Sequence, residues 1–502
     1  MAGRVVALVG LLSTVLAPGA SGSAVPGSDP GDLECPLGPR PGCVAWAERW
    51  DLPDDPGHHT GRAVATTPDG SIVLVTTDRT DLAYDPATGR RLWSAPNDGS
   101  GAVGGQDLAL NPSGSMMVST AEAAYPHPER VTSGEVVLTA RHPASGRGLW
   151  QARYRDPGQE PYTPRAVAVT EAGVFVAGDG GLLPRHVFTA AFDPETGARR
   201  WLSTYGGERA GRPPGPTRTV AVAATPDGQR VFVTGFMVVR APRVEWATLA
   251  YDGRTGALLW SASHPGGGDS AAEPKQMVLH PDGRLLYVTG WSRRSGALGE
   301  SFDFVTIAYD TATGRTVWAD GYRSPVAGAL ADSDDLGWSV EVSPDGRRLY
   351  VAGYSEDPVD PDPGGPNYRV EARDPLTGAP LWSATVPSFS ATTDQEGLFG
   401  HVVVRSSPDG GEVYLAMAAH DDSAPRRYGV HGSDYRDIVF AVAGFDAASG
   451  RFLWRGTYAV PDVEATYTAD LAVDPDGRRI YVTGAGSDPG RAFAQTTAFA
   501  VR

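Results

Sequence analysis

A hairpin turn of the type Pro-Asp-Gly recurs eight times along the 502-residue chain. The copies lie at 68–70, 112–114, 171–173, 226–228, 281–283, 344–346, 408–410 and 475–477, where the second reads Pro-Ser-Gly and the third Glu-Ala-Gly. Their mean spacing is about 58 residues, which is typical of β-propeller blades rather than of helical solenoids. Runs rich in β-branched and aromatic residues flank these turns, so each copy predicts a β-hairpin.

A second turn follows in all but the last repeat, with an acid, then Gly four residues later, then Trp four residues further on. The copies are Asp85/Gly89/Trp93, His142/Gly146/Trp150, Asp193/Gly197/Trp201, Asp252/Gly256/Trp260, Asp310/Gly314/Trp318, Asp374/Gly378/Trp382 and Asp446/Gly450/Trp454, with His replacing the acid once. An Asp side chain accepts backbone N–H groups in such a turn, and Gly allows a positive φ. Each repeat therefore predicts a four-stranded antiparallel sheet.

The last repeat is incomplete, because the chain ends at Arg502 before a Gly and a Trp can follow. The missing pair occurs near the other end as Gly42 and Trp46. An open ring would leave an unpaired strand edge, so we expect the strand within 42–50 to complete the last sheet. The sequence thus predicts an all-β, eight-bladed propeller over 42–502. The tryptophans at the equivalent positions are expected to form a structural girdle: Trp46, Trp93, Trp150, Trp201, Trp260, Trp318, Trp382 and Trp454.

The segments Ala83 to Trp93 and Ala308 to Trp318 both read Ala-Tyr-Asp-x-x-Thr-Gly-x-x-x-Trp. This pattern resembles the tryptophan-docking repeat of the pyrroloquinoline-quinone-like, or quinoprotein dehydrogenase-like, propellers, in a form similar to secreted bacterial repeats that mostly lack an assigned activity. A dehydrogenase of this family would be expected to have adjacent cysteines, a calcium ion and an aspartate base. The chain has only two cysteines and they are not adjacent, so pyrroloquinoline quinone is not the favoured cofactor. Calcium is not favoured either, because the acidic loops of the chain lack the spacing of an EF-hand.

Residues 1–24 are typical of a secretory signal peptide. Arg4 precedes an apolar run over 5–17, and small residues follow at 22–24. The run is shorter than the ~20 residues that cross a bilayer, and no other segment is long and apolar enough. We therefore expect a secreted, extracellular protein with no membrane span.

Residues 25–41 are rich in Pro and Gly and are expected to form a strap leading into the propeller. In an oxidising compartment, Cys35 and Cys43 are expected to form a disulfide that closes a short loop.

The formal net charge is −16, and Lys275 is the one lysine of the chain. Nucleic acids and anionic membranes are bound through clustered cations, so the sequence argues against both partners. It does not define the oligomeric state, for which a monomer is favoured.

Insertions concentrate between the second and third strands of a repeat, with the largest at 121–134, 355–367 and 420–437. These connections should open on the face opposite the turns. Loops on a rigid scaffold commonly carry recognition, so this variable-loop face is the candidate binding face.

The first strand of each repeat should line a central channel with the residues one, three and five positions before its turn. These include Asp107, Gln276 and Asp470. Glu341 and Arg405 occupy one register on neighbouring strands, so we expect an ion pair that is either structural or a ligand contact.

At the channel mouth we expect Lys275, Trp338 and His401. Trp338 lies outside the girdle, and it could stack on a planar ligand or sugar, or cap a blade interface.

These features favour a non-catalytic binding or scaffold module that recognises a protein, a glycan or a small polar ligand. A quinone-dependent oxidoreductase is one alternative, and a hydrolase or lyase with its site at the channel mouth is another. The sequence contains no nucleophile elbow, zinc-protease motif or phosphate loop. Acidic loops at 332–335 and 357–362 lack the glycine-pinned spacing of an EF-hand, so no metal site is predicted.

Overall fold

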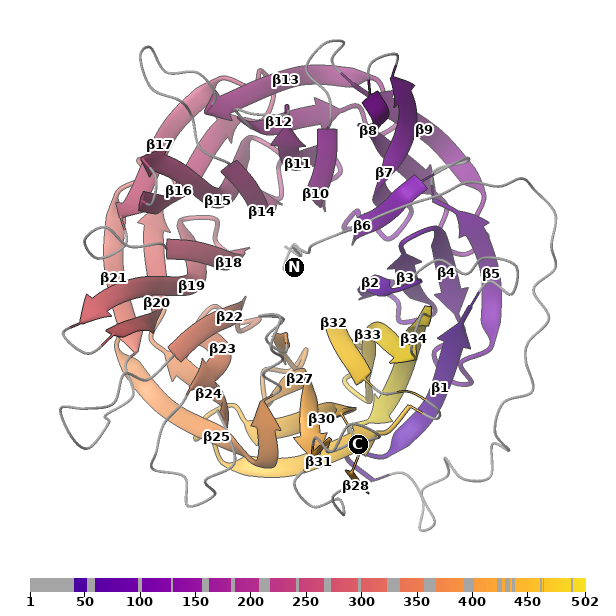
Figure 1. Cartoon of the computed structure of the whole chain (residues 1–502), viewed down its shortest axis with the longest axis vertical. Helices are drawn as coiled ribbons and strands as arrows, with labels where there is room; N and C mark the ends of the chain where they lie inside the picture. Colours follow the sequence, from indigo (N-terminus) through magenta and orange to yellow (C-terminus); the bar gives the residue numbers. More distant parts are fainter. Residues whose placement is uncertain are drawn as a thin grey trace.

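The computed structural model describes residues 40–51, 59–97, 102–127, 130–155, 162–181, 186–206, 217–240, 243–265, 272–296, 299–322, 335–355, 367–391, 401–421, 427–428, 434–435, 438–460, 463, 465–488 and 491–502. Every helix or strand in these residues is a β-strand, and the strands form eight blades around a central channel (Figure 1). The predicted eight-bladed propeller is therefore confirmed. The predicted signal peptide, most of the strap and Cys35 lie outside the described residues.

Blades one to four each contain four consecutive strands. They are β2 (Gly61–Thr66), β3 (Val73–Thr77), β4 (Thr80–Tyr84) and β5 (Arg91–Pro96); β6 (Ala102–Leu110), β7 (Met117–His127), β8 (Arg130–Arg141) and β9 (Gly148–Tyr154); β10 (Tyr162–Val169), β11 (Val174–Gly180), β12 (His186–Phe192) and β13 (Arg199–Gly206); β14 (Thr217–Ala224), β15 (Arg230–Arg240), β16 (Arg243–Asp252) and β17 (Leu258–Pro265).

Blades five to eight complete the ring. They are β18 (Ala272–Leu279), β19 (Leu285–Gly296), β20 (Gly299–Asp310) and β21 (Thr316–Tyr322); β22 (Asp335–Val342), β23 (Leu349–Ser355), β24 (Asn367–Arg373) and β25 (Pro380–Ala391); β26 (Val402–Ser406), β27 (Glu412–Asp421), β30 (Ile438–Asp446) and β31 (Phe452–Tyr458); β32 (Ala465–Val473), β33 (Arg479–Asp488), β34 (Arg491–Ala500) and β1 (Val44–Trp50). A small hairpin, β28 (Arg427–Tyr428) and β29 (Asp434–Tyr435), lies within the 420–437 insertion.

The closing strand comes from the N-terminal end, as predicted. β1 pairs antiparallel with β34, with Trp46 opposite Ala498. The Gly42 amide donates to the Ala500 carbonyl at 2.8 Å, and in the preceding blade the Gly450 amide donates to the Asp446 carbonyl at the same distance. The two ends of the chain thus reproduce the backbone geometry of an intact blade.

Blades six and seven form one continuous sheet, which the sequence did not predict. The end of β25 pairs with β27 through Phe389–Ala391 and Ala419–Asp421. β25 has 12 residues, whereas the outermost strands of the other blades have six to eight, and its extra length brings its end to β27.

The girdle tryptophans join successive blades. In seven of them the indole N–H donates to a backbone carbonyl in the Asp-to-Gly turn of the next blade, at the second residue of that turn. The pairs are Trp46–Pro86, Trp93–Pro143, Trp150–Pro194, Trp201–Gly253, Trp260–Thr311, Trp318–Pro375 and Trp382–Ala447. The indole also lies against the turn glycine, where a Cβ on Gly89 would approach Trp46 to 2.7 Å. Trp454 donates instead to the Glu412 carboxylate, because the last blade has the chain ends in place of that turn.

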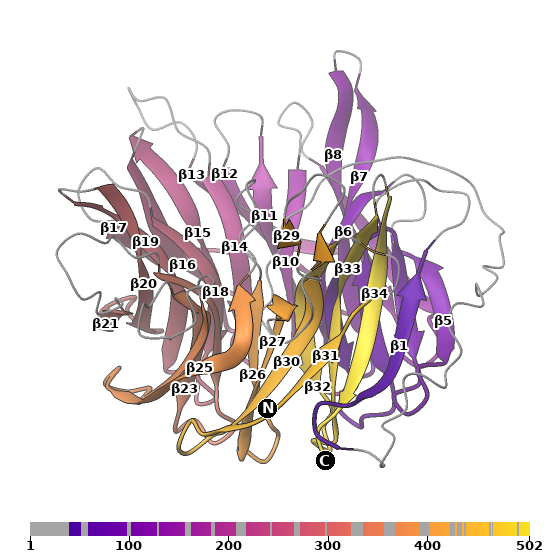
Figure 2. The same cartoon turned by 60° about the horizontal axis from the view of Figure 1, so that its bottom comes forward.

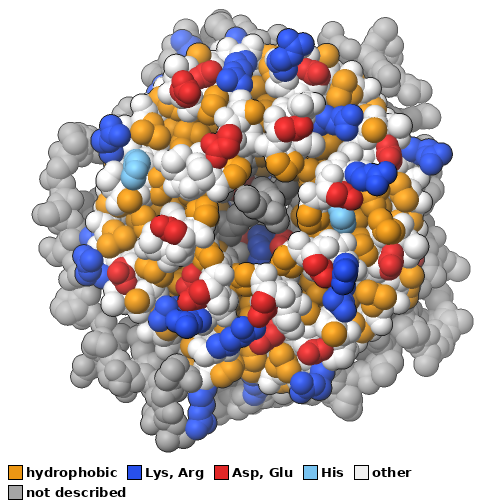
Figure 3. Space-filling view, turned by 180° about the vertical axis from the view of Figure 1, so that it is seen from behind, with side chains coloured by type: hydrophobic (Ala, Val, Ile, Leu, Met, Phe, Trp, Pro, Cys, Tyr) orange, Lys and Arg blue, Asp and Glu red, His pale blue; other side chains and the backbone are white. Residues whose placement is uncertain are grey.

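The connections on the face opposite the Pro-Asp-Gly turns differ in length, and the β7–β8 hairpin projects from the ring (Figure 2). On the side seen from behind in Figure 3, described acidic and basic side chains are interspersed around the central opening. Among the described residues, no helix has the length and apolar character needed to cross a membrane.

Candidate functional site

Seven of the eight innermost strands contain a register shift at one position, six residues before the turn. The residues at this position are Arg62, Gln106, Arg165, Val220, Lys275, Trp338 and Ala469. A β-bulge places an extra residue in one strand and re-aims its side chain. Gly or Pro directly precedes the bulge in five of these strands, at Gly61, Gly105, Pro164, Pro274 and Gly337, and both residues weaken regular pairing.

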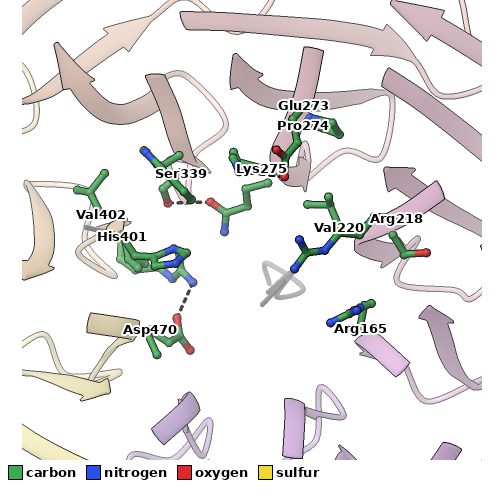
Figure 4. A pocket seen from close by; sticks show the side chains of 16 residues that line it. Arg165, Arg218, Val220, Glu273, Pro274, Lys275, Ser339, His401, Val402 and Asp470 are labelled. Carbon is green, nitrogen blue, oxygen red and sulfur yellow. Dashed lines mark hydrogen bonds and ion pairs between the residues drawn. The ribbon is translucent and has the colours of Figure 1, made fainter. Parts of the chain in front are cut away.

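Several of these re-aimed side chains line a pocket in the channel, near the strand ends that face away from the Pro-Asp-Gly turns. The pocket has a volume of about 80 Å³ and opens into the channel solvent. Side chains on or next to six neighbouring innermost strands line this space, among them Trp338. Figure 4 labels Arg165, Arg218, Lys275, His401 and Asp470 around it. A binding pocket commonly combines apolar walls with a few convergent polar groups, as here.

Lys275 occupies the bulge of β18 and contacts both an acid and an aromatic ring. Its Nζ lies 2.9 Å from Glu273 Oε1 and 4.4 Å from the centroid of the Trp338 ring. The ring face attracts the ammonium group. Burial lowers the pKa of the Lys275 amine, and the nearby Arg218 charge adds to this effect, while Glu273 opposes it.

Trp338 and His401 form the aromatic wall of the pocket. Their rings make an edge-on contact, with centroids 4.7 Å apart and planes inclined by 66°. Burial lowers the pKa of His401 to about 4, and the charges of Lys275 and Arg62 act in the same direction. His401 is therefore neutral at pH 7. The Trp338 indole nitrogen is buried and has no hydrogen-bond partner among the described residues, which leaves a donor for a ligand.

Arg405 forms an ion pair with a different partner from the one expected. Its Nη2 lies 3.2 Å from Asp470 Oδ1 on the following blade, whereas the sequence analysis expected Glu341 on the preceding blade. Asp470 sits two residues further from its turn than Arg405 does, and the long arginine side chain spans the difference in level. Asp470 also accepts the Val64 amide at 2.9 Å.

Asp107 was expected to face the channel, but it is 1% exposed and joins two blades. Its Oδ2 accepts the Val167 amide of the next blade at 2.8 Å. Gln276 acts similarly, because its Oε1 accepts the Val340 amide at 2.7 Å, although it also lines the pocket edge. Asp107 and Glu341 are not among the residues that line the pocket, whereas Trp338, His401, Lys275, Arg405, Gln276 and Asp470 are.

The sequence analysis did not identify two charged lining residues, Arg218 and Glu273. Both lie eight residues before their turns, at an even offset that simple alternation directs away from the channel. The bulge reverses the alternation, so even offsets face the channel beyond it. The recurring basic residues at the bulge, Arg62, Arg165 and Lys275, were the available signal for this reversal.

Comparison with known proteins identifies the family. Residues 54–189 and 185–420 match the PQQ_2 family model, described as outer membrane protein assembly factor BamB. The chain belongs to this BamB family of PQQ-like propellers.

Solved structures share the fold of this BamB-family chain at low identity. Quinohemoprotein alcohol dehydrogenase from Comamonas testosteroni is 14% identical over 91% of this chain and 76% of its own, with a TM-score of 0.50. A europium-containing methanol dehydrogenase is 12% identical over 91% of this chain and 93% of its own, with a TM-score of 0.51. No curated protein sequence matches the chain. At these identities the likeness shows the fold alone.

The pocket of this BamB-family propeller does not fit the quinone and metal pair of such dehydrogenases. Its two lining acids, Glu273 and Asp470, are each held by a cation, Lys275 and Arg405. Among the described residues, no cluster of three or more His, Cys, Asp or Glu side chains has an arrangement suited to a metal ion. Cys43 directly precedes β1, outside the channel lining.

Proposed function

We propose that this BamB-family propeller is a non-catalytic binding module that acts after export and takes a small carboxylate-bearing ligand into the channel pocket. The observation that supports this proposal is the local reversal of charge. The pocket is lined by four cations, Arg165, Arg218, Lys275 and Arg405. Three of them pair with the carboxylates of Asp179, Glu273 and Asp470, so one positive charge remains in excess, whereas the whole chain has a net charge of −16. A cleft with low-dielectric walls focuses such a field on an oppositely charged ligand.

The aromatic wall adds selectivity to this charge. A planar or apolar part of the ligand can pack against Trp338. The Trp338 indole N–H has no partner among the described residues and can donate to one of the ligand's oxygens. An unpaired buried donor costs about 1–3 kcal/mol, so a ligand that accepts this hydrogen bond removes a penalty present in the empty pocket.

The proposal is tested by isothermal titration calorimetry with carboxylates and their neutral amides, beginning with benzoate and benzamide. We expect carboxylates to bind more tightly than the matching amides and to weaken as salt rises. Arg218→Ala should weaken carboxylate binding about tenfold, because tenfold corresponds to about 1.4 kcal/mol, a reasonable value for one lost charge contact.

The matched control is Arg347→Ala. Arg347 follows the turn at 344–346, its side chain is 83% exposed, and it lies at the opposite ends of the strands from the pocket. Its removal should leave binding unchanged. Equal affinity for each acid and its amide, or equal effects of the two arginine variants, would contradict the proposal.

A further inference from the structure

The one lysine of the chain lies in the channel pocket, whereas the other 42 of its 43 basic residues are arginines. Like three arginines of the channel, Lys275 holds a carboxylate: Lys275 pairs with Glu273, Arg62 lies 2.5 Å from Asp78, Arg165 lies 2.9 Å from Asp179, and Arg405 pairs with Asp470. Arginine serves well for a permanent charge and for stacking on aromatic faces. A lysine amine differs because it can lose its proton and become a nucleophile.

We propose that Lys275 captures the ligand as an imine with the carbonyl carbon of a 2-oxo acid. The proposal rests on the proposed function, since Arg218 would bind the carboxylate of the same molecule. It adds a reversible covalent bond and narrows the ligand class from carboxylates to carboxylates with an adjacent carbonyl group.

The groups around Lys275 are suited to this step. Glu273 Oε1, 2.9 Å from Nζ, is placed to accept the ammonium proton. Arg218 occupies the position in the preceding blade that corresponds to Glu273, eight residues before the turn, and it lines the same pocket. Burial lowers the pKa of the Lys275 amine and the Arg218 charge acts in the same direction, whereas the charge and hydrogen bond of Glu273 oppose them. Desolvation and a neighbouring cation also activate lysines in other proteins.

The ligand oxygens also have partners on the opposite wall. The Trp338 indole N–H can donate to the carbonyl oxygen or to the carboxylate. His401 is neutral and contacts Trp338, so its imidazole can relay a proton without adding a charge.

The reaction balances without an oxidant or reductant. The neutral amine attacks the carbonyl carbon, a C–N bond forms, and the C=O π electrons move to oxygen. The nitrogen then releases one proton and the oxygen takes one up. The resulting carbinolamine loses its hydroxyl group, with a second proton, as water, and a C=N bond remains. Hydrolysis reverses each step and releases the 2-oxo acid.

The test is reductive trapping of the purified chain with glyoxylate and cyanoborohydride at pH 7, followed by peptide mass mapping. The chain has two aliphatic amines, Lys275 and its α-amino group, and the α-amino group is an internal reference. An unperturbed lysine with a pKa of about 10.4 reacts more slowly at pH 7 than an α-amine of about 8. We expect the reverse, with the carboxymethyl group appearing on Lys275 at least about tenfold faster than on the α-amine.

Three controls distinguish a built site from ordinary lysine chemistry. Acetaldehyde, which lacks the carboxylate, should lose the preference for Lys275, and so should the denatured chain. Lys275→Arg should give no channel adduct, with unchanged circular dichroism as the folding check.

Labelling of Lys275 no faster than that of the α-amine would overturn the imine proposal. If benzoate still binds more tightly than benzamide, only the covalent step is wrong and the proposed function stands. If that difference is also absent, both proposals fail.

Discussion

His401 shows how the channel sets the protonation state of one side chain. In the unfolded chain a histidine takes up a proton near pH 6.5, whereas in the folded protein burial and two cations hold the pKa of His401 at about 4. As the pH falls below 6.5, the histidine takes up a proton in the unfolded chain before it does so in the folded protein, and this favours unfolding. The stability contribution of neutral His401 is complete above pH 6.5 and is lost as the pH falls to about 4.

This effect can be measured by urea unfolding of the wild type and of His401→Gln between pH 7 and pH 4. One extra proton on the unfolded state gives a slope of up to about 1.4 kcal/mol per pH unit. We expect the wild type to lose stability more steeply than the variant between pH 6.5 and 4. Parallel curves for the two proteins would show that His401 is not neutral in the folded state.

Single residues also mark how far sequence could predict the site. Lys275, Trp338 and His401 were identified because their positions in the repeat place them at the channel mouth, above the residues that line the channel. Arg218 and Glu273 were missed because the direction of a side chain depends on a bulge, which is a property of strand pairing. The Arg405 partner was wrong for a related reason, since a long side chain can cross between levels that sequence register keeps apart.

At the scale of the element, the innermost strands are held together by side chains that accept amide hydrogens from the next blade. Asp107 accepts from Val167, Gln276 from Val340, Ser339 from Val404, and Asp470 from Val64. All four acceptors lie five residues before their turns, and all four donors lie four residues before theirs. These bonds fix adjacent strands in level and so align the bulges that build the pocket.

Asp107→Ala tests this contribution. Alanine occupies the same offset at Ala63, Ala166 and Ala221, so it fits the strand. The variant leaves the buried Val167 amide without its partner, and we expect a loss of about 1–3 kcal/mol in the free energy of unfolding. Asp107→Asn retains an acceptor oxygen and should lose less. Equal stability of the alanine variant and the wild type, measured by urea unfolding, would refute the role of this bond.

At the scale of the whole molecule, the two chain ends in the last blade together supply four of the five residues of the turn that the other blades have. Ala500 stands where the other blades have the turn acid, and Gly42 where they have the turn glycine, judged by their matching hydrogen bonds. One residue between Arg502 and Gly42 would restore the five-residue turn.

A circular permutant can exploit this geometry. The chain is opened in the 281–283 turn, Arg502 is joined to Gly42 through one threonine, and Ala500→Asp restores the acid. A covalent link at the seam reduces the entropy cost of closing the ring, so we expect a folded monomer that unfolds no earlier than the wild type in a thermal scan.

The control permutant carries Gly42→Ala. Gly42 has a φ of 85°, and a Cβ there would meet the Arg455 carbonyl oxygen at 2.1 Å. This variant should unfold at a lower temperature than the first permutant. If both permutants unfold together, well below the wild type, the seam is not a regular turn.

The number of blades and the ring closure were predictable because each repeat contains its own turn residues and its own tryptophan. The fusion of blades six and seven was not, since it depends on where two long strands meet in space. The Trp454 contact with Glu412 has the same origin, because it arises where the repeating turn is absent.

The fused sheet has a mechanical consequence. β22 contains Trp338, and β26 begins directly after His401; both strands belong to a single eight-stranded sheet. β14 contains Arg218 and β18 contains Lys275, and these two strands belong to separate sheets. One wall of the pocket is thus part of a continuous sheet that spans two blades, and the opposite wall is formed by two blades that share no strand pairing. If the pocket widens to admit a ligand, we expect the blades that carry Arg218 and Lys275 to move, while the wall formed by Trp338 and His401 stays in place.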